Sequence, residues 1–176
     1  MDIKAFKMDG LGNDFVIVDR RKSEINLTKE QIIKIGDRNN VGFDQIIFIE
    51  KKVKDVLPIK IYNPDGIEVG ACGNGSRCIA YLISKENNQK TIKLEAQNKI
   101  LEAEILSEKL VRINMGLPEF KDNKSIPIKE GLDPRKVSID FMKKEYGNGI
   151  CVNVGNPHIV FFVKDCEKID IQKIGP

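Results

Sequence analysis

Ala71-Cys72-Gly73-Asn74-Gly75-Ser76-Arg77-Cys78 stands at the start of the longest helical pattern in the chain, which runs from Ser76 to about Glu86. The turn cluster Asn63-Pro64-Asp65-Gly66 precedes it. Cys72 is therefore expected just ahead of a helix N-terminus. Unpaired N–H groups and the helix dipole there favour a thiolate and can hold a carboxylate. The alternative, a buried structural cysteine, is less favoured because two glycines leave room for a ligand.

The two cysteines of this stretch are expected to differ in reactivity. The pKa of Cys72 is predicted to lie below that of a free thiol because backbone donors and the helix dipole stabilise the thiolate. Cys78 follows six residues later, about 600° around a helix. It therefore faces almost the opposite side and is assigned to the core.

The rest of the first two thirds of the chain indicates an α+β fold. Thr28-Lys-Glu-Gln31 is a capping-box pattern that opens a helix to about Arg38, with Ile32, Ile33 and Ile35 as its apolar side. We expect a curved, mostly antiparallel sheet wrapped around the helix that begins near Gly75, with Ile79, Leu82 and Ile83 buried. Strands are predicted at residues 2–8, 15–18, 46–49, 58–62, 67–70, 91–96, 99–106, 110–115, 137–144, 150–154 and 159–163.

An internal echo predicts two pseudo-symmetric domains. Gly12-Asn13 and Gly155-Asn156 each precede an apolar strand. Gly116 and Pro118 break the pattern between them, so domains are expected at 1–118 and 119–176. The position that would match Cys72 in the second domain falls beyond residue 176, so that domain is expected to be incomplete. Apolar residues 159–162 would then lack part of their cover and promote association.

Composition excludes several classes of protein. The 176 residues carry a formal charge of +3, with 41% hydrophobic and 31% charged residues and no tryptophan, which does not suggest nucleic-acid binding. The charged N-terminal region is neither a signal peptide nor a membrane span. Four cysteines without framework spacing suggest reduced thiols in a cytoplasm, and one histidine makes a structural zinc site improbable. Neither a Walker loop nor a dinucleotide fingerprint is present.

Several motifs resemble those of the diaminopimelate epimerase family and occur in the family's order. The resemblance implies an isomerase that interconverts LL- and meso-diaminopimelate in lysine and cell-wall precursor biosynthesis. It also implies two cysteines acting as acid and base without a cofactor, and a cytoplasmic homodimer in the full-length protein. The motifs are Met8-Asp-Gly-Leu-Gly-Asn-Asp-Phe15, Gly42-Phe-Asp-Gln45, Asn63-Pro-Asp-Gly66, Cys72-Gly-Asn-Gly-Ser-Arg-Cys78, Asn114-Met-Gly-Leu-Pro118 and Gly155-Asn-Pro-His158.

By this resemblance Cys72 is one of the two catalytic cysteines. His158 matches a position that tunes a cysteine pKa, although a structural histidine after the turn is an equal alternative. Each matching amide could alone be a turn residue, but amide oxygens suit ammonium groups and N–H donors suit carboxylates. Phe15 is assigned to the core. The matching substrate contacts are Asn13, Gln45, Asn63, Gly73, Asn74 and Asn156.

Inversion at a carbon by proton transfer needs a base on one face and an acid on the other. Cys151 lies in an apolar strand and Cys166 in a polar loop, so neither replaces the second cysteine. Residues 1–176 alone are therefore not expected to epimerise. No lysine for pyridoxal phosphate is identifiable, and neither a metal nor another cofactor is implied.

Three alternative functions are open. A proline racemase or hydroxyproline epimerase resembles this pattern, but those relatives usually show histidine where Asn74 stands. A cysteine hydrolase needs a histidine oriented toward Cys72, for which His158 is the candidate. An amino-acid binding module would bind the substrate without exchanging its α-hydrogen.

Overall fold

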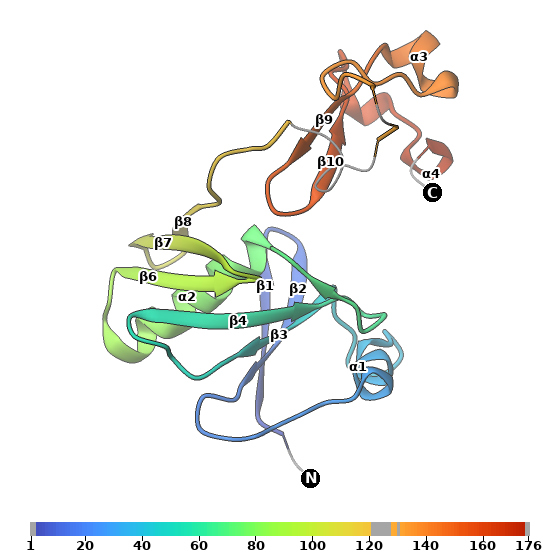
Figure 1. The fold of residues 1–176 in the computed structure, drawn as a ribbon. Coiled ribbons are helices and arrows are strands. Elements are labelled where there is room, and N and C mark those ends of the chain that lie inside the picture. The colour runs from blue at the N-terminus through green and yellow to red at the C-terminus, as the bar shows by residue number, and fades with distance from the viewer. Residues whose placement is uncertain (1–2, 121–127, 130, 175–176) are drawn as a thin grey trace. The chain divides into compact units, whose positions relative to one another are not determined.

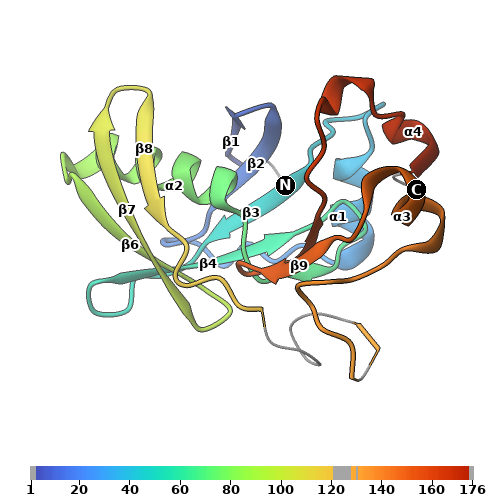
Figure 2. The same ribbon diagram turned by 90° about the horizontal axis from the view of Figure 1, so that it is seen from above.

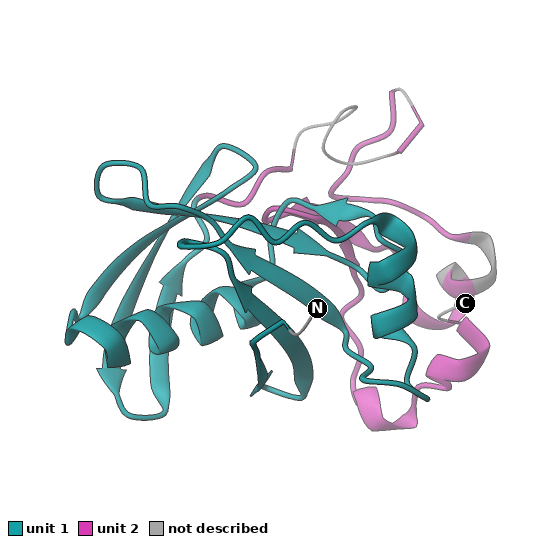
Figure 3. Cartoon of the chain, turned by 90° about the horizontal axis from the view of Figure 1, so that it is seen from below, with its two compact units in different colours: residues 1–116 teal, residues 117–176 magenta. Residues whose placement is uncertain are grey.

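The computed structural model describes residues 3–120, 128–129 and 131–174. The chain forms two compact units, residues 1–116 and 117–176 (Figure 3). The division falls after Gly116, which has a positive φ of 82°, and lies two residues before the boundary that the sequence indicated. A glycine accepts this backbone conformation without steric cost.

The first unit is built on one eight-stranded sheet in the order β1-β2-β3-β4-β6-β7-β8, with β5 paired to β4. Only the β2–β3 and β4–β6 pairs are parallel, so the predicted α+β fold with a mostly antiparallel sheet is confirmed. Its strands are β1 (Ala5–Gly10), β2 (Asn13–Asp19), β3 (Gln45–Ile49), β4 (Val56–Tyr62), β5 (Glu68–Val69), β6 (Thr91–Ala96), β7 (Lys99–Ser107) and β8 (Leu110–Asn114).

The sheet curls around helix α2 (Gly73–Asn87), which contacts β1 and β2 at one end of the strand order and β7 and β8 at the other. Figure 1 shows β1 and β2 running across the direction of β4, β6 and β7, and Figure 2 shows β6, β7 and β8 beside α2. Ile79 and Ile83 are buried and Leu82 is partly buried, as predicted. The helix begins at Gly73, slightly earlier than expected, and ends at Asn88 in the left-handed conformation that often terminates helices.

The central residues 15–18 of strand β2 are all apolar because both faces of the sheet are covered there. Phe15 and Ile17 pack in the core with α2, whereas Val16 and Val18 pack in a second core with Ile32 of helix α1 (Lys29–Gly36). Alternate residues of a strand point to opposite faces, so a continuous apolar run indicates burial on both sides. The same division places Ile47 and Ile49 of β3 beside α2, and Ile46 and Phe48 on the α1 side.

Helix α1 has the predicted capping box. The Thr28 hydroxyl accepts from the Gln31 N–H at 3.3 Å, and the Gln31 side chain accepts from the Thr28 N–H at 2.8 Å. The prediction of Ile33 on the apolar side was wrong, because Ile33 is 45% exposed. The short helix buries only Ile32 and Gly36, one turn apart, with Ile35 partly covered.

We expect Thr28→Ala to lower the free energy of unfolding of the full chain by about 1 kcal/mol, since an N-cap hydroxyl satisfies an unpaired N–H of the first turn. Urea titration measures the change. Thr28→Ser is the matched control because it keeps the hydroxyl, and it should retain most of the stability. Equal losses in both variants would show that the cap does not stabilise this helix.

The second unit contains helix α3 (Asp140–Tyr146), strands β9 (Ile150–Asn153) and β10 (Pro157–Val160), the 3₁₀ turn η1 (Cys166–Lys168) and helix α4 (Ile171–Ile174). The strand predicted over 137–144 was wrong. Only Val137 forms a bridge, to Gly149, and a helix follows. The Met-Lys-Lys-Glu run within it consists of helix-forming residues.

Strands β9 and β10 form an antiparallel hairpin whose turn carries Gly155 and Asn156. The β1–β2 hairpin of the first unit likewise turns at Leu11–Gly12, immediately before Asn13. Ile159, Val160 and Phe162 are exposed, Phe162 by 80%. A two-stranded sheet with uncovered apolar residues has little independent stability.

Candidate active site

Three predicted site residues of the first unit lie where neighbouring strands of its sheet begin or end, on the same side of the sheet. Asn13 is the first residue of β2 and Gln45 the first of β3, and these strands run parallel. Asn63 directly follows β4, which runs antiparallel to β3, so it reaches the same side. Because β2, β3 and β4 are neighbours in the sheet, the strand order brings residues 13, 45 and 63 to the same side of it.

Cys72 is the N-cap residue of α2. Its sulfur accepts a hydrogen bond from the Gly75 N–H at 3.3 Å, which is the bond that a serine or aspartate oxygen makes at other helix starts. The first helical bond runs from the Ser76 N–H to the Cys72 carbonyl at 2.8 Å. The N–H groups of Gly73 and Asn74 therefore have no helical partner and are suited to an anion.

The prediction that Cys72 has a lowered pKa was wrong. Burial of the thiol raises its pKa, and this effect outweighs the backbone N–H groups of Gly75 and Asn74, which lower it. Desolvation disfavours the thiolate because the charged form loses water. Cys72 therefore rests as a thiol, the form that can donate a proton.

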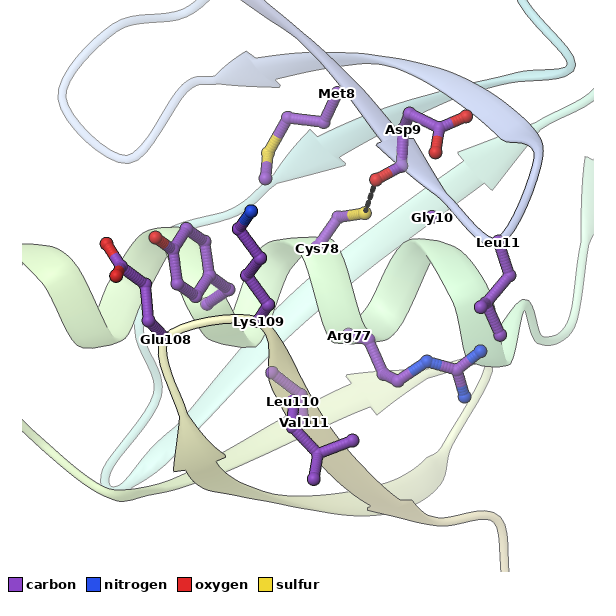
Figure 4. Close-up of a pocket in the computed structure, with 11 residues that line it drawn as sticks. Met8, Asp9, Gly10, Leu11, Arg77, Cys78, Glu108, Lys109, Leu110 and Val111 are labelled. Atoms are coloured by element: carbon purple, nitrogen blue, oxygen red, sulfur yellow. Dashed lines mark hydrogen bonds between the residues drawn. The ribbon is translucent and has the colours of Figure 1, made fainter.

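Cys78 is buried, as predicted, and its sulfur lies 3.6 Å from the Asp9 carbonyl (Figure 4). Burial raises its pKa to about 11. It lies at the base of a groove of about 600 Å³ between β1 and β8, the two edge strands of the sheet. Figure 4 shows Arg77 extending along this groove toward Leu11.

Alkylation should separate the four thiols. Cys166 is exposed and should react with iodoacetamide first, followed by Cys72, whereas Cys78 and Cys151 are buried and should stay unlabelled in the folded chain. Because its pKa is raised, Cys72 should react slowly at neutral pH and faster as the pH rises above the ordinary thiol range. Peptide mapping after limited labelling measures the order. Preferential labelling of Cys78 would refute the assignment of Cys72 as the accessible thiol.

Gln45 and Asn63 form a polar pair with one unused acceptor. The Gln45 Nε2 donates to Asn63 Oδ1 at 3.1 Å, while Gln45 Oε1 is buried with no hydrogen-bond partner among the described residues. A buried acceptor without a partner carries a desolvation cost that a ligand donor would remove. The arrangement is therefore suited to an ammonium group or another N–H donor.

Asn13 and Asn74 are joined directly: Asn74 Nδ2 donates to Asn13 Oδ1 at 2.7 Å. Asp44 accepts from Asn13 Nδ2 at 3.0 Å, and Arg77 donates to Asn74 Oδ1. Sequence reasoning assigned no role to Asp44 or Arg77. Both stand inside motifs that the resemblance used: Asp44 directly precedes the assigned Gln45, and Arg77 lies three residues after the assigned Asn74. That position is the signal that could have identified them.

The remaining predicted residues lie together in the second unit. His158, in β10, and Asn156, in the preceding turn, are both exposed, and His158 Nε2 lies 2.9 Å from Asn156 Oδ1. Phe15, which the sequence assigned to the core, is fully buried.

Within residues 3–120, 128–129 and 131–174, no group of three or more His, Cys, Asp and Glu side chains could hold a metal ion. None of the helices in this described part has both the length and the apolar character needed to cross a membrane.

Comparison with known proteins gives consistent matches. A family model described as diaminopimelate epimerase matches residues 5–121. The diaminopimelate epimerase of Pelagibacter ubique is 47% identical, with 100% of this chain and 65% of that protein covered. That of Rhodospirillum centenum is 37% identical, with 98% and 60% covered. The chain thus spans less than two thirds of the length of these relatives.

The fold also resembles that of a solved structure of a predicted epimerase from Pseudomonas aeruginosa, with a TM-score of 0.65 at 13% identity. The match covers 98% of this chain and 66% of that one. At this identity the likeness concerns the fold alone.

Proposed function

The chain belongs to the diaminopimelate epimerase family, and from that premise we propose that the protein is a cofactor-independent isomerase that interconverts LL- and meso-diaminopimelate. The observation that carries the proposal is the position of Cys72 at the N-cap of α2, beside the N–H groups of the first helical turn and the linked side-chain amides of Asn13 and Asn74. The expected cytoplasmic location and homodimer are part of the same proposal.

In the proposed reaction the α-carboxylate of the substrate binds the N–H groups of Gly73 and Asn74 at the start of α2. These donors are fixed before the substrate arrives, so they stabilise the charge that develops on the carboxylate when the α-carbon loses its proton. An unused acceptor such as Gln45 Oε1 suits an ammonium group of the ligand.

Cys72 acts in the proposal as one of two proton-transfer groups on opposite faces of the α-carbon. A base on the far face removes the α-proton, and the Cys72 thiol delivers its own proton to the near face, which inverts the centre. Its raised pKa supports this donor role in one direction. In the reverse direction Cys72 starts as the thiolate and removes the proton.

We further propose that Asn156 contacts the substrate and that His158 tunes a thiol of the completed site. The hydrogen-bond distance between these two side chains supports a shared role, because Asn156 can orient the imidazole.

Ligand protection of Cys72 tests the proposed substrate. meso-Diaminopimelate should slow alkylation of Cys72 in the full-length protein, while trans-4-hydroxyproline and lysine should not, since each lacks one of the two amino-acid ends. Alkylation of the exposed Cys166 serves as the internal control, because it reports whether the added ligand changes the reactivity of the alkylating reagent itself. Protection by hydroxyproline without protection by diaminopimelate would favour a proline racemase-like isomerase instead.

A further inference from the structure

Four polar side chains form one continuous hydrogen-bonded chain beside Cys72. Asn13 Nδ2 donates to Asp44 Oδ2 at 3.0 Å, and Asn74 Nδ2 donates to Asn13 Oδ1 at 2.7 Å. Arg77 Nη2 donates to Asn74 Oδ1 at the other end. The chain therefore crosses from the start of β3, through the start of β2, to the first turns of α2.

The two ends of this chain fix the direction of both amides. An aspartate carboxylate only accepts hydrogen bonds and a guanidinium only donates them. Asn13 must therefore turn its Nδ2 toward Asp44 and its Oδ1 toward Asn74. The same orientation follows from the Arg77 end, because Asn74 must turn its Oδ1 toward the guanidinium.

We propose that Asp44 and Arg77 are positioning residues that together lock the side-chain amides of Asn13 and Asn74 in one orientation next to Cys72. This deepens the proposed function, on which its consequence for substrate binding rests. A side-chain amide that can flip presents donor or acceptor indifferently, whereas a locked amide presents one of them. Loss of either end leaves the hydrogen-bonded chain anchored on one side only and loosens both amides.

The Asp44 end is itself held in place. Arg38 Nη2 donates to Asp44 Oδ1 at 2.6 Å and also to Asp14 Oδ1 at 2.8 Å, and the Asp14 N–H donates to Asp44 Oδ2 at 3.0 Å. Hydrogen bonds from Arg38 and Lys7 hold the pKa of Asp14 well below its usual range, so Asp14 stays ionised at neutral pH. The acceptor at the end of the chain is thus fixed by the backbone as well as by charge.

The opposite charges at the two ends also act on the neighbouring thiol. The positive charge of Arg77 lowers the pKa of Cys72, and the negative charge of Asp44 raises it. Neutralising one end should therefore shift the pH at which Cys72 becomes alkylated in the opposite direction from neutralising the other. Arg77→Met should move it up and Asp44→Asn down.

Side-chain amide exchange tests the locking directly, without reference to activity. In the ¹⁵N-labelled full chain, Asp44→Asn should make the Asn74 side-chain N–H protons exchange roughly tenfold faster, although Asp44 does not bond to Asn74. Arg77→Met, at the other end of the chain of hydrogen bonds, should likewise speed exchange of the Asn13 side-chain N–H protons. Arg77→Lys keeps a charged donor and should restore most of the protection.

Arg112→Met is the matched control because it removes an exposed arginine that pairs with Glu104 in the same sheet. It should change neither amide. Effects confined to the immediate neighbour, with Asn74 unchanged by Asp44→Asn and Asn13 unchanged by Arg77→Met, would overturn the proposal. If one variant fails to fold, the variant at the other end decides.

Ligand protection then separates this inference from the proposed function. The two variants should each weaken protection of Cys72 by meso-diaminopimelate, by up to about a hundredfold. The double variant should lose no more protection than the single variant that loses more, because both substitutions act through the same amides. Additive losses would contradict a shared network. Suppose that meso-diaminopimelate does not protect Cys72 in the unaltered protein, but each variant still speeds exchange at the distant amide. That result would contradict the proposed function and leave the positioning role standing.

Discussion

Replacing Cys72 by serine should reduce the interconversion of LL- and meso-diaminopimelate by the full-length protein about 10²- to 10⁴-fold, the range that a positioned acid–base group contributes. The serine hydroxyl can occupy the same N-cap position and accept the Gly75 N–H, so the helix start should be preserved. A hydroxyl is a much weaker acid than a thiol, however, and cannot exchange the α-proton at a useful rate. The loss should therefore appear in kcat more than in KM.

Cys78→Ala is the matched control for this substitution. Cys78 lies in the same helix but is buried against the Asp9 carbonyl, with a pKa raised to about 11. Its removal should leave kcat within a fewfold of the unaltered protein. A Cys72→Ser protein that keeps full activity would contradict the assignment of Cys72 to proton transfer.

Replacing Gly75 by alanine should lower the free energy of unfolding by about 1–3 kcal/mol, the usual cost of an overpacked core. A Cβ at this position would lie 2.5 Å from Ile47 Cδ1, 3.3 Å from Phe15 Cε1 and 3.5 Å from the Cys72 sulfur. Ile47 and Phe15 are fully buried, so they cannot move aside without disturbing the core. The same displacement should shift Cys72 and lower activity.

Gly73→Ala provides a comparison within the same helical turn. Its Cβ would lie 3.3 Å from Met115 Sδ, a flexible side chain that can give way. Both substitutions gain helix propensity of about 1 kcal/mol over glycine, so the difference between them isolates the steric effect. Urea unfolding of the full chain measures it. Equal stability of the two variants would show that the space beside Gly75 does not constrain the site.

Local patterns were sufficient to predict most of the first unit. The capping box at Thr28 and the helix after Cys72 depend on hydrogen bonds and spacings within a few residues, and both are found. The two-residue turn Gln97–Asn98 has positive φ at both positions, as a tight hairpin requires.

Properties that depend on distant residues were predicted less well. The pKa of Cys72 shifts in the direction opposite to the prediction, because burial by surrounding elements outweighs the local N–H donors. Only those donors are visible in the sequence. The roles of Asp44 and Arg77 arise from contacts across 31 and 61 positions of chain through Asn13 and Asn74. A strand was predicted over residues 137–144, whereas the helix-forming residues after Ile139 decide the structure.

The origin of the α-proton in the inverted product tests the two-face mechanism most directly. The full-length protein would convert LL-diaminopimelate in heavy water, and mass spectrometry at low conversion would follow both isomers. If two groups act on opposite faces, newly formed meso product should carry one solvent deuterium at its inverted α-carbon, while unreacted substrate should carry almost none. Inverted product that retains the original α-proton would contradict the two-face mechanism, because a single group would then have returned the proton that it removed.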